Sequence, residues 1–540
     1  MAEIAVIGAG AAGLATLKNL LEEGFHATAF DRDTEIGGIW NLRDDGQPSV
    51  LESTIANNSS DFACYTDFPY PKGSATYPSA REVLLYLHAY AEHFDLRPHI
   101  RLGTTIRRAR LTSVDGAEKW GLTIKKEGTA QEVVYFDRLV IASGLFSTPS
   151  QPDIPGLSKF EGRVMHSSAY KRPADFNGLN VLVVGTGNTA ADVVTTLKEH
   201  AKQVYWSHRP GALIPFGYKL PRRIKEMPLD HTLTYRSTSI GDMVATYFPT
   251  YATRTMLREL EKAQNAVFTI RPEWALSPAP PLRHALPIIT DDLVGELETG
   301  RALSVPRIRC ITGKRSIQFE DNSTLNDIDV IVFCTGYTKT DWALVGSDLD
   351  PTRHTTPRWM TARGSAGRPL PRLYQNIFSL DRPLSLAYVG VFSGIISGFT
   401  MSDLTSMVLT QVWKGNSILP SPEEMSKHTD AHHSWLCSIA ETGSCSPHTL
   451  DFSKWSVWAH ETAGTSVHRK LGYGLEGWWF WLRDRTFSNT LRTGIMSPFV
   501  FRLFPGTKRK AWTGAREAIE VLNRERKGRI FGWHGGEETD

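Results

Sequence analysis

Two glycine-rich segments, one at the start of the chain and one near residue 185, constrain its fold more than any other feature. The first follows the apolar run at residues 4–7 and has the spacing G-x-G-x-x-G, with Gly8, Gly10 and Gly13 as its glycines. In a strand–turn–helix unit the first glycine permits a tight turn, the second lets the backbone approach a pyrophosphate, and the third lets the helix pack on the strand. The helix expected from about residue 10 to residue 23 points its N-terminal N–H groups at the phosphates. The segment therefore predicts a unit that binds a dinucleotide.

The residues that follow this unit indicate which dinucleotide it binds. Asp31 ends the expected second strand, where a carboxylate accepts a hydrogen bond from a ribose hydroxyl. A carboxylate at this position repels a 2′-phosphate, so it favours FAD or NAD over NADP. The segment EIGGIW at residues 35–40 places Gly38 and Trp40 just beyond the ribose site, where a flat cofactor can lie against the backbone. We therefore predict that the first unit binds FAD.

The second glycine-rich segment, at residues 179–200, repeats the strand–turn–helix pattern. Its small and polar turn residues are Gly185, Gly187, Asn188 and Ala190, with alanine in place of the third glycine. The next expected strand ends in Ser207, His208 and Arg209, where the first unit has its aspartate. A hydroxyl and a guanidinium can bind a 2′-phosphate through charge-assisted hydrogen bonds. This unit is predicted to bind NADPH, although an arginine on a solvated loop is the alternative reading of Arg209.

The ends of two further strands indicate how the units are connected. Buried strands are expected at residues 139–142 and 328–333, and they lead into the similar pairs Ser143-Gly144 and Thr335-Gly336. We infer an α/β protein with two Rossmann-like domains, the NADP domain inserted into the FAD domain, and a mixed helical C-terminal region. The predicted divisions are residues 1–170 and 331–420 for the FAD domain, 171–330 for the NADP domain, and 421–540 for the C-terminal region.

Composition limits the functional classes and the cellular location. A chain of 540 residues can hold two or three domains, and a net charge of +3 gives no support for nucleic-acid binding. Five scattered cysteines fit a reducing compartment. The first expected strand begins almost at Met1, and no apolar run is long enough to span a bilayer. We expect a protein of the cytoplasm, or one on the cytoplasmic face of an internal membrane.

The segment FEGRVMHSSAY at residues 160–170 lies between the two glycine-rich units. It fills the pattern F-x-G-x-x-x-H-x-x-x-[YF] with Phe160, Gly162, His166 and Tyr170, and with it the chain resembles the flavin-containing monooxygenases, class B flavoproteins of the dimethylaniline N-oxidase type. EIGGIW, the IANNSS segment at residues 55–60 and CTGY at 334–337 also match that family. The resemblance implies that NADPH reduces FAD, that O2 then forms a C4a-(hydro)peroxide, and that one oxygen passes to a soft nucleophile.

The resemblance also assigns roles to single residues. Asn57 matches the active-site asparagine of the family, although its position alone would be explained by turn capping. His166, Tyr170, Asp403 and the pairs Ser143-Gly144 and Thr335-Gly336 are implied to lie at the cofactors. Tyr170-Lys171 stands where Baeyer–Villiger enzymes usually carry tryptophan, which favours oxidation of nitrogen or sulfur in an amine or thioether. A Baeyer–Villiger monooxygenase that converts ketones to esters or lactones is the alternative.

The C-terminal part contains three less specific patterns. A helix is expected to start near Ser402 or Asp403. Residues 428–448 contain four histidines and two cysteines, but the spacing matches no zinc pattern, so we predict no metal and a helix with exposed histidines. Residues 473–510 alternate aromatic side chains with Arg and Lys, which suits either a membrane surface or a cover over a substrate channel or domain interface. Peripheral membrane contact and a homodimer are both left open.

Overall fold

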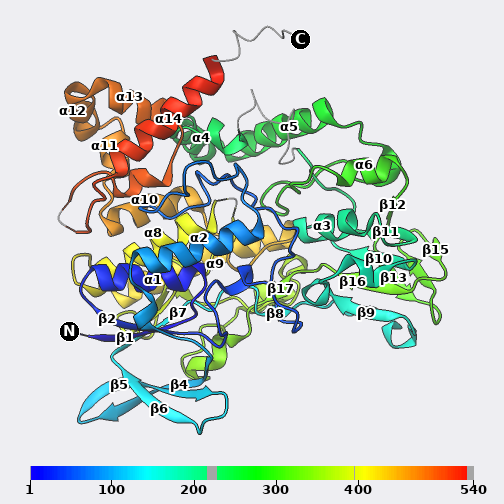
Figure 1. Ribbon diagram of the computed structural model, residues 1–540, viewed down its shortest axis with the longest axis horizontal. Coiled ribbons are helices and arrows are strands. Elements are labelled where there is room, and N and C mark those ends of the chain that lie inside the picture. The colour runs from blue at the N-terminus through cyan, green and yellow to red at the C-terminus, as the bar shows by residue number, and fades with distance from the viewer. Residues whose placement is uncertain (1, 216–227, 395, 507, 532–540) are drawn as a thin grey trace.

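The computed structural model describes residues 2–215, 228–394, 396–506 and 508–531, and it shows one mixed sheet, one parallel sheet and a helical C-terminal region (Figure 1). The first sheet has the strand order β18-β19-β20-β7-β1-β2-β3. Its strands are β1 (Glu3–Ile7), β2 (His26–Phe30), β3 (Ile100–Arg101), β7 (Arg138–Ile141), β18 (Leu373–Tyr374), β19 (Phe378–Ser379) and β20 (Leu386–Tyr388). The pairs from β20 through β7, β1 and β2 to β3 are parallel, and β1 lies at the centre between β2 and β7.

Each face of the first sheet has a different cover. On one face lie α1 (Ala11–Glu22) and α2 (Ala80–His93), and α1 packs against α8 (Gly398–Trp413). On the other face lies an antiparallel sheet of β4 (Thr104–Val114), β5 (Ala117–Lys126) and β6 (Glu132–Phe136), seen at the lower edge of Figure 1. The buried β-branched residues of β1 and β7 fit a strand that is covered on both faces. The domain therefore has three layers, and the glycine turn after β1 lies at the carboxyl edge of its middle layer, the sheet.

The second sheet contains five parallel strands in the order β12-β11-β10-β16-β9. They are β9 (Arg163–His166), β10 (Asn180–Val184), β11 (Gln203–Ser207), β12 (Ala302–Val305) and β16 (Val330–Phe333). The helices α3 (Asn188–Leu197) and α6 (Leu293–Glu298) contact this sheet, and the hydrophobic cluster on its other face includes residues of β13 (Ile308–Ile311) and β14 (Ile317–Phe319), which form a small sheet with β15 (Thr324–Leu325). The two Rossmann-like units predicted from the glycine turns are confirmed.

The second sheet is inserted between β7 and β18 of the first. At the crossing, β8 (Thr148–Pro149) and β17 (Tyr337–Thr338) pair as an antiparallel ribbon. One strand differs from the sequence-based division, because β9 pairs with β16 in the second sheet although residues up to 170 were assigned to the FAD domain. The predicted boundaries at 170, 330 and 420 remain predictions.

Between β11 and β12 the chain makes a long excursion. Its described residues include the helices α4 (Tyr235–Tyr247) and α5 (Pro249–Val267), which precede α6. Thr234 and Ser237 form a capping box at the start of α4, and Pro249 occupies the first position of α5, where a helix needs no N–H donor. The prolines at residues 272–287, which suggested an irregular surface run, lie after both helices.

The C-terminal region is helical and packs on the domain of the first sheet through α8. Its elements are α9 (Pro422–Thr442), α10 (Phe452–Ala463), α11 (Val467–Leu471), α12 (Leu475–Arg483), α13 (Arg485–Thr493), the 3-10 helix η10 (Pro498–Arg502) and α14 (Ala515–Phe531). The remaining α-helix, α7 (Pro357–Thr361), contacts α9. The expected start of α8 at residue 402 or 403 is wrong, because Ser397 already precedes the first turn and Asp403 lies inside the helix. Among the described residues no helix is long and apolar enough to cross a membrane.

Candidate active site

The first glycine turn is built by contacts between backbones. Gly8 has a φ of 111°, and a Cβ there would lie 2.6 Å from the carbonyl oxygen of Ala142 at the end of β7. A Cβ on Gly13 would lie 1.8 Å from the carbonyl oxygen of Gly8. Only glycine fits either position, so the chain holds the tight turn and the free helix N-terminus that a pyrophosphate requires. The turn fits the FAD predicted for it.

Asp31 lies beside this turn at the end of β2. Its Oδ2 accepts a hydrogen bond of 2.6 Å from the N–H of Ala9, and its Oδ1 accepts one of 3.0 Å from the N–H of Asp33. Burial raises the pKa of the Asp31 carboxyl, and these backbone N–H groups oppose the rise. The carboxylate is thus fixed at the edge of the glycine turn, in the place predicted for a ribose contact.

An aromatic layer adjoins the turn on the α8 side. Gly38 and Trp40 form the short 3-10 helix η1 (Gly38–Trp40), and the Trp40 ring stacks on Phe399 with centroids 6.4 Å apart. Phe399 in turn packs edge-on against Tyr65 at 5.4 Å, and the Tyr65 hydroxyl donates a 2.7 Å hydrogen bond to the carbonyl of Ala11. This contact joins the segment around Tyr65 to the first residue of α1.

Asn57 lies in the turn-rich segment that leads to Tyr65, and its side chain is exposed. Two residues later, the N–H of Ser59 donates a 2.7 Å hydrogen bond to Oδ2 of Asp230, which comes from the excursion of the second sheet. Asp61 faces His231, with 2.9 Å between Oδ2 and Nε2. The sequence analysis did not single out Asp230 or His231, and the only local signal was an acid–histidine pair in a proline-rich stretch.

The second glycine turn also requires glycine for its backbone geometry. Some of the polar groups predicted to bind the nucleotide, however, form hydrogen bonds within the protein. A Cβ on Gly185 would lie 2.4 Å from the carbonyl oxygen of Cys334, which fixes glycine at that position, whereas Gly187 has no atom of the described residues within 4 Å of a Cβ position. Ala190 is buried, as close helix packing requires. Oδ1 of Asn188 accepts a 2.9 Å hydrogen bond from the N–H of Ile289.

The end of β11 leaves one cationic group at the surface. The buried hydroxyl of Ser207 donates a 2.8 Å hydrogen bond to the carbonyl of Pro306. The imidazole of His208 is also buried, against Ser304 and the backbone of Arg209, and burial lowers its pKa. The Arg209 side chain is exposed. Arg209 is therefore better placed than Ser207 to meet a 2′-phosphate.

The crossing between the sheets brings the motif residue His166 together with the predicted pair Thr335-Gly336. His166 Nε2 lies 2.9 Å from the carbonyl oxygen of Gly336, and burial lowers the pKa of His166, which favours the neutral ring that can donate this bond. The Thr335 hydroxyl donates to the carbonyl of Ser150. Tyr170 is buried, and its hydroxyl is 2.8 Å from the Thr196 hydroxyl of α3. His166 thus joins β9 to the crossing, while Tyr170 belongs to the core of the second domain.

A buried lysine that the sequence analysis missed completes this crossing. Lys339 donates to the Ser143 hydroxyl at 2.7 Å and to the Gly144 carbonyl at 3.2 Å, and its Nζ lies 2.6 Å from Oδ1 of Asp341. Burial lowers the pKa of Lys339, and Asp341 opposes this change. All three ammonium donors have acceptors, so Lys339 binds the end of β7 to the strand that returns from the second sheet.

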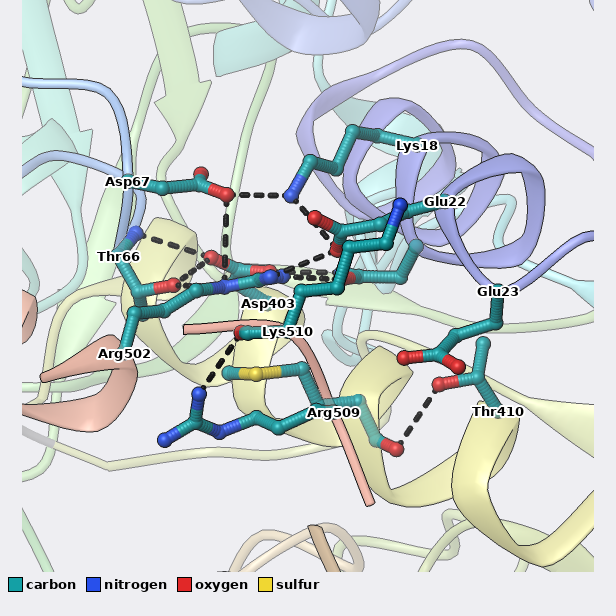
Figure 2. Close-up of polar contacts among 12 residues, drawn as sticks. Lys18, Glu22, Glu23, Thr66, Asp67, Asp403, Thr410, Arg502, Arg509 and Lys510 are labelled. Carbon is teal, nitrogen blue, oxygen red and sulfur yellow. Dashed lines mark hydrogen bonds and ion pairs between the residues drawn. The ribbon is translucent and has the colours of Figure 1, made fainter. Parts of the chain in front are cut away.

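Asp403, predicted to lie at a cofactor, is part of a buried network of charges between α1, α8 and η10, drawn in Figure 2. Its Oδ1 accepts a 2.7 Å hydrogen bond from Asn19, and its Oδ2 accepts from the N–H and the hydroxyl of Thr66 at 2.9 and 2.6 Å. Arg502 donates to Glu22 at 2.6 Å and to Thr66 at 3.1 Å. Both oxygens of Asp403 are thus used by the protein, and its side chain is fully buried.

Of the four histidines at residues 428–448, His428 is exposed as expected and His432 is half-buried, but the other two are not exposed. His433 and His448 are buried, and burial lowers their pKa values to about 4 and about 3. His433 lies on the α9 face that also buries Met425 and Thr429, at intervals of four residues. Within the described ranges no three His, Cys, Asp or Glu side chains are grouped so as to hold a metal ion.

Comparisons with known proteins agree on one family. Residues 1–530 match the family model described as flavin-binding monooxygenase-like. The chain is 41% identical over 528 residues to monooxygenase aurF of Gibberella zeae, covering 98% of each chain, and 30% identical to the N-oxide-forming dimethylaniline monooxygenase 2 of Cavia porcellus, covering 78% of this chain and 75% of that one. The structure of S-allyl-L-cysteine S-oxygenase from Allium sativum aligns with a TM-score of 0.62 at 20% identity, over 97% of this chain and 98% of that one.

Proposed function

The chain belongs to the flavin-binding monooxygenase-like family, and from this premise we propose that it transfers one oxygen atom of O2 to a nitrogen or sulfur atom of a small organic substrate. It is a flavin-dependent monooxygenase that uses FAD and NADPH. Bound FAD, once reduced by NADPH, supplies the activation of O2, and the protein supplies binding, orientation and the exclusion of water.

The observation that carries the choice of a heteroatom is the likeness to the N-oxide-forming enzyme, 30% identical over 431 residues. Tyr170-Lys171 supports it, because Baeyer–Villiger enzymes usually have tryptophan at this point of the motif. In the structure the Tyr170 hydroxyl contacts Thr196, and Lys171 Nζ donates to the Ser49 hydroxyl at 2.5 Å.

The residues with proposed binding roles follow from the two turns and the crossing. The first turn and the N-terminus of α1 would hold the FAD pyrophosphate, and Asp31 its ribose. Asn57 would present its amide to the flavin or the substrate, since an amide both donates and accepts hydrogen bonds. Gly185, Gly187 and the N-terminus of α3 would hold the NADPH pyrophosphate, and Arg209 its 2′-phosphate.

A substrate panel tests the proposed reaction. Purified enzyme with FAD and NADPH is offered a tertiary amine, a thioether and a cyclic ketone, and the products are identified by mass spectrometry. We expect an N-oxide or a sulfoxide as the main product. A lactone as the main product would reject heteroatom oxidation in favour of Baeyer–Villiger chemistry.

Replacing Arg209 by alanine should reduce the preference for NADPH over NADH. A hydrogen bond to a charged group is worth about 1.5–3 kcal/mol, so kcat/KM for NADPH should fall by roughly 10- to 100-fold while the value for NADH stays within about twofold. Arg209→Lys keeps the positive charge but loses the planar, forked guanidinium. Its kcat/KM for NADPH should therefore lie between the values of the parent enzyme and Arg209→Ala. An equal loss with both nucleotides would contradict the role given to Arg209.

For the aromatic helix α12 we propose peripheral contact with a membrane surface. Leu475, Trp478, Trp479 and Leu482 are between 50% and 91% exposed. The guanidinium groups of Arg483 and Arg485 lie over the rings of Trp479 and Trp481, an arrangement that suits a lipid interface. Sedimentation with anionic vesicles should be lost in Trp478→Ser/Trp479→Ser and kept in the control Trp435→Ser. Sedimentation unchanged by the double substitution, or loss of a homodimer instead, would reject the membrane contact.

A further inference from the structure

The segment from Asn57 to Asp67 is held to the rest of the protein at both of its ends. At the far end Thr66 and Asp67 enter the buried charge network with Asp403 and Arg502. At the near end the N–H of Ser59 donates its 2.7 Å hydrogen bond to Oδ2 of Asp230. The near attachment lies only two residues from Asn57, so together with the 2.8 Å hydrogen bond from the Ala56 N–H to the Pro78 carbonyl it restrains the backbone that carries this side chain.

Asp230 does not come from the FAD domain to which this segment belongs. It lies in the 3-10 helix η6 (Leu229–Thr232), in the excursion between β11 and β12 of the second sheet. The same excursion is fixed to the C-terminal region, because Oδ1 of Asp242 on α4 accepts a 2.6 Å hydrogen bond from the Ser453 hydroxyl. The near end of the Asn57 segment, whose Ser60 N–H donates to the Thr76 carbonyl within its own domain, is therefore also attached to the unit predicted to bind NADPH.

The hydrogen bond between Ser59 and Asp230 is buried, so a charged Asp230 carboxylate at this position costs free energy. Asp230 is 8% exposed and Ser59 is fully buried. Burial raises the pKa of Asp230, and the N–H of Ser59 and the neighbouring His231 oppose the rise. A buried carboxylate costs several kcal/mol unless it is paired or hydrogen-bonded, so a residue that only filled space here would be better apolar. The carboxylate therefore points to a specific use of its Oδ2, which accepts the hydrogen bond from Ser59.

We propose that Asp230 is a positioning residue that fixes the backbone at Ser59 and so keeps the Asn57 side chain at the reaction centre. This inference rests on the proposed role of Asn57. A side chain that must act on a short-lived oxygenating species needs a fixed position, because small displacements at a reacting centre cost large factors in rate. Loss of the Asp230 contact should therefore release oxygen as hydrogen peroxide instead of product.

The test compares Asp230→Ala, Asp230→Asn and Asp242→Ala in FAD-loaded enzyme, with a substrate accepted by the parent. The readouts are product and hydrogen peroxide formed per NADPH oxidised, and the rate of flavin reduction by NADPH. Asp230→Ala should lower product per NADPH about fivefold or more and leave the rate of flavin reduction within about twofold. Asp230→Asn keeps an oxygen that can accept from Ser59, so it should restore at least half of the coupling. Asp242→Ala removes a charge and a contact from the same excursion, but it should stay coupled.

Three results would overturn the inference: full coupling in Asp230→Ala, equal uncoupling in Asp242→Ala, or no rescue by Asp230→Asn. If Asp230→Ala does not retain FAD, Asp230→Ser takes its place with the same expectation. Asn57→Ala separates this inference from the proposed function. If Asn57→Ala is uncoupled, the double variant with Asp230→Ala should be no worse, because both act through one side chain. If Asn57→Ala stays coupled, the role of Asn57 fails, whatever Asp230→Ala does.

Discussion

Replacing Gly13 by alanine is expected to abolish stable binding of FAD and, with it, all NADPH-dependent oxygenation. The added Cβ would lie 1.8 Å from the carbonyl oxygen of Gly8 and 2.7 Å from its carbonyl carbon. Both are backbone atoms of the turn itself, so the clash can be relieved only by moving α1 away from β1 or by opening the turn. Either movement withdraws the helix N-terminus from the pyrophosphate. We expect FAD affinity to fall by more than about 100-fold, measured as FAD per protein after gel filtration and by titration of the apoprotein.

Gly187→Ala is the matched control for this prediction. It adds the same methyl group at a glycine turn, but there no atom of the described residues lies within 4 Å of the new Cβ. This variant should retain FAD fully, and any loss should appear in the KM for NADPH, because the methyl group would occupy the approach to the second pyrophosphate. A Gly13→Ala enzyme that is purified with a full complement of FAD would contradict the geometry of the first turn.

The sequence predicts the parts of this protein whose shape is fixed by a few consecutive residues. Gly8 and Gly13 each meet a backbone oxygen, so their identity follows from the turn, and the insertion of one sheet into the other follows from the matching strand ends at Ser143 and Thr335. Asp31 can be located by its distance from the turn, because both are fixed by one βαβ unit. In each case the sequence pattern that allows the prediction spans a few neighbouring residues or repeats a known structural unit.

The parts that were missed depend on contacts between distant segments. Lys339 is conspicuous only once Ser143 is brought beside it, and Asp230 only once it meets Ser59, 171 positions earlier. Asp403 could be placed on a helix but not in the charge network, since its partners lie near residues 19, 66 and 502. The burial of His433 could have been predicted, because it follows Met425 and Thr429 at four-residue intervals.

Replacing Arg502 by methionine is expected to destabilise the protein by about 3–5 kcal/mol, the usual cost of removing one partner from a buried ion pair. The Arg502 side chain is 1% exposed, and it lies among the carboxylates of Glu22, Asp67 and Asp403. In its absence Lys18 is the only cation of the network in Figure 2 that still contacts Glu22 and Asp67. The excess of buried negative charge then has to be hydrated or protonated. Urea unfolding of FAD-saturated enzyme at pH 7.5 measures the change.

Two comparisons separate charge from packing in this prediction. Arg516→Met removes an arginine that pairs with Asp484 and Glu520 but is 54% exposed, so it should cost less than about 1 kcal/mol. The pKa values of Glu22 and Asp67 are lowered in the folded protein; burial acts to raise them, but the charges of Arg502 and Lys18 outweigh it. Their ionic stabilisation is therefore present above the unfolded pKa and is lost as the pH falls. The difference between parent and Arg502→Met should accordingly shrink as the pH falls below about 4.5, the ordinary pKa of a glutamate, whereas a loss caused only by packing would stay constant.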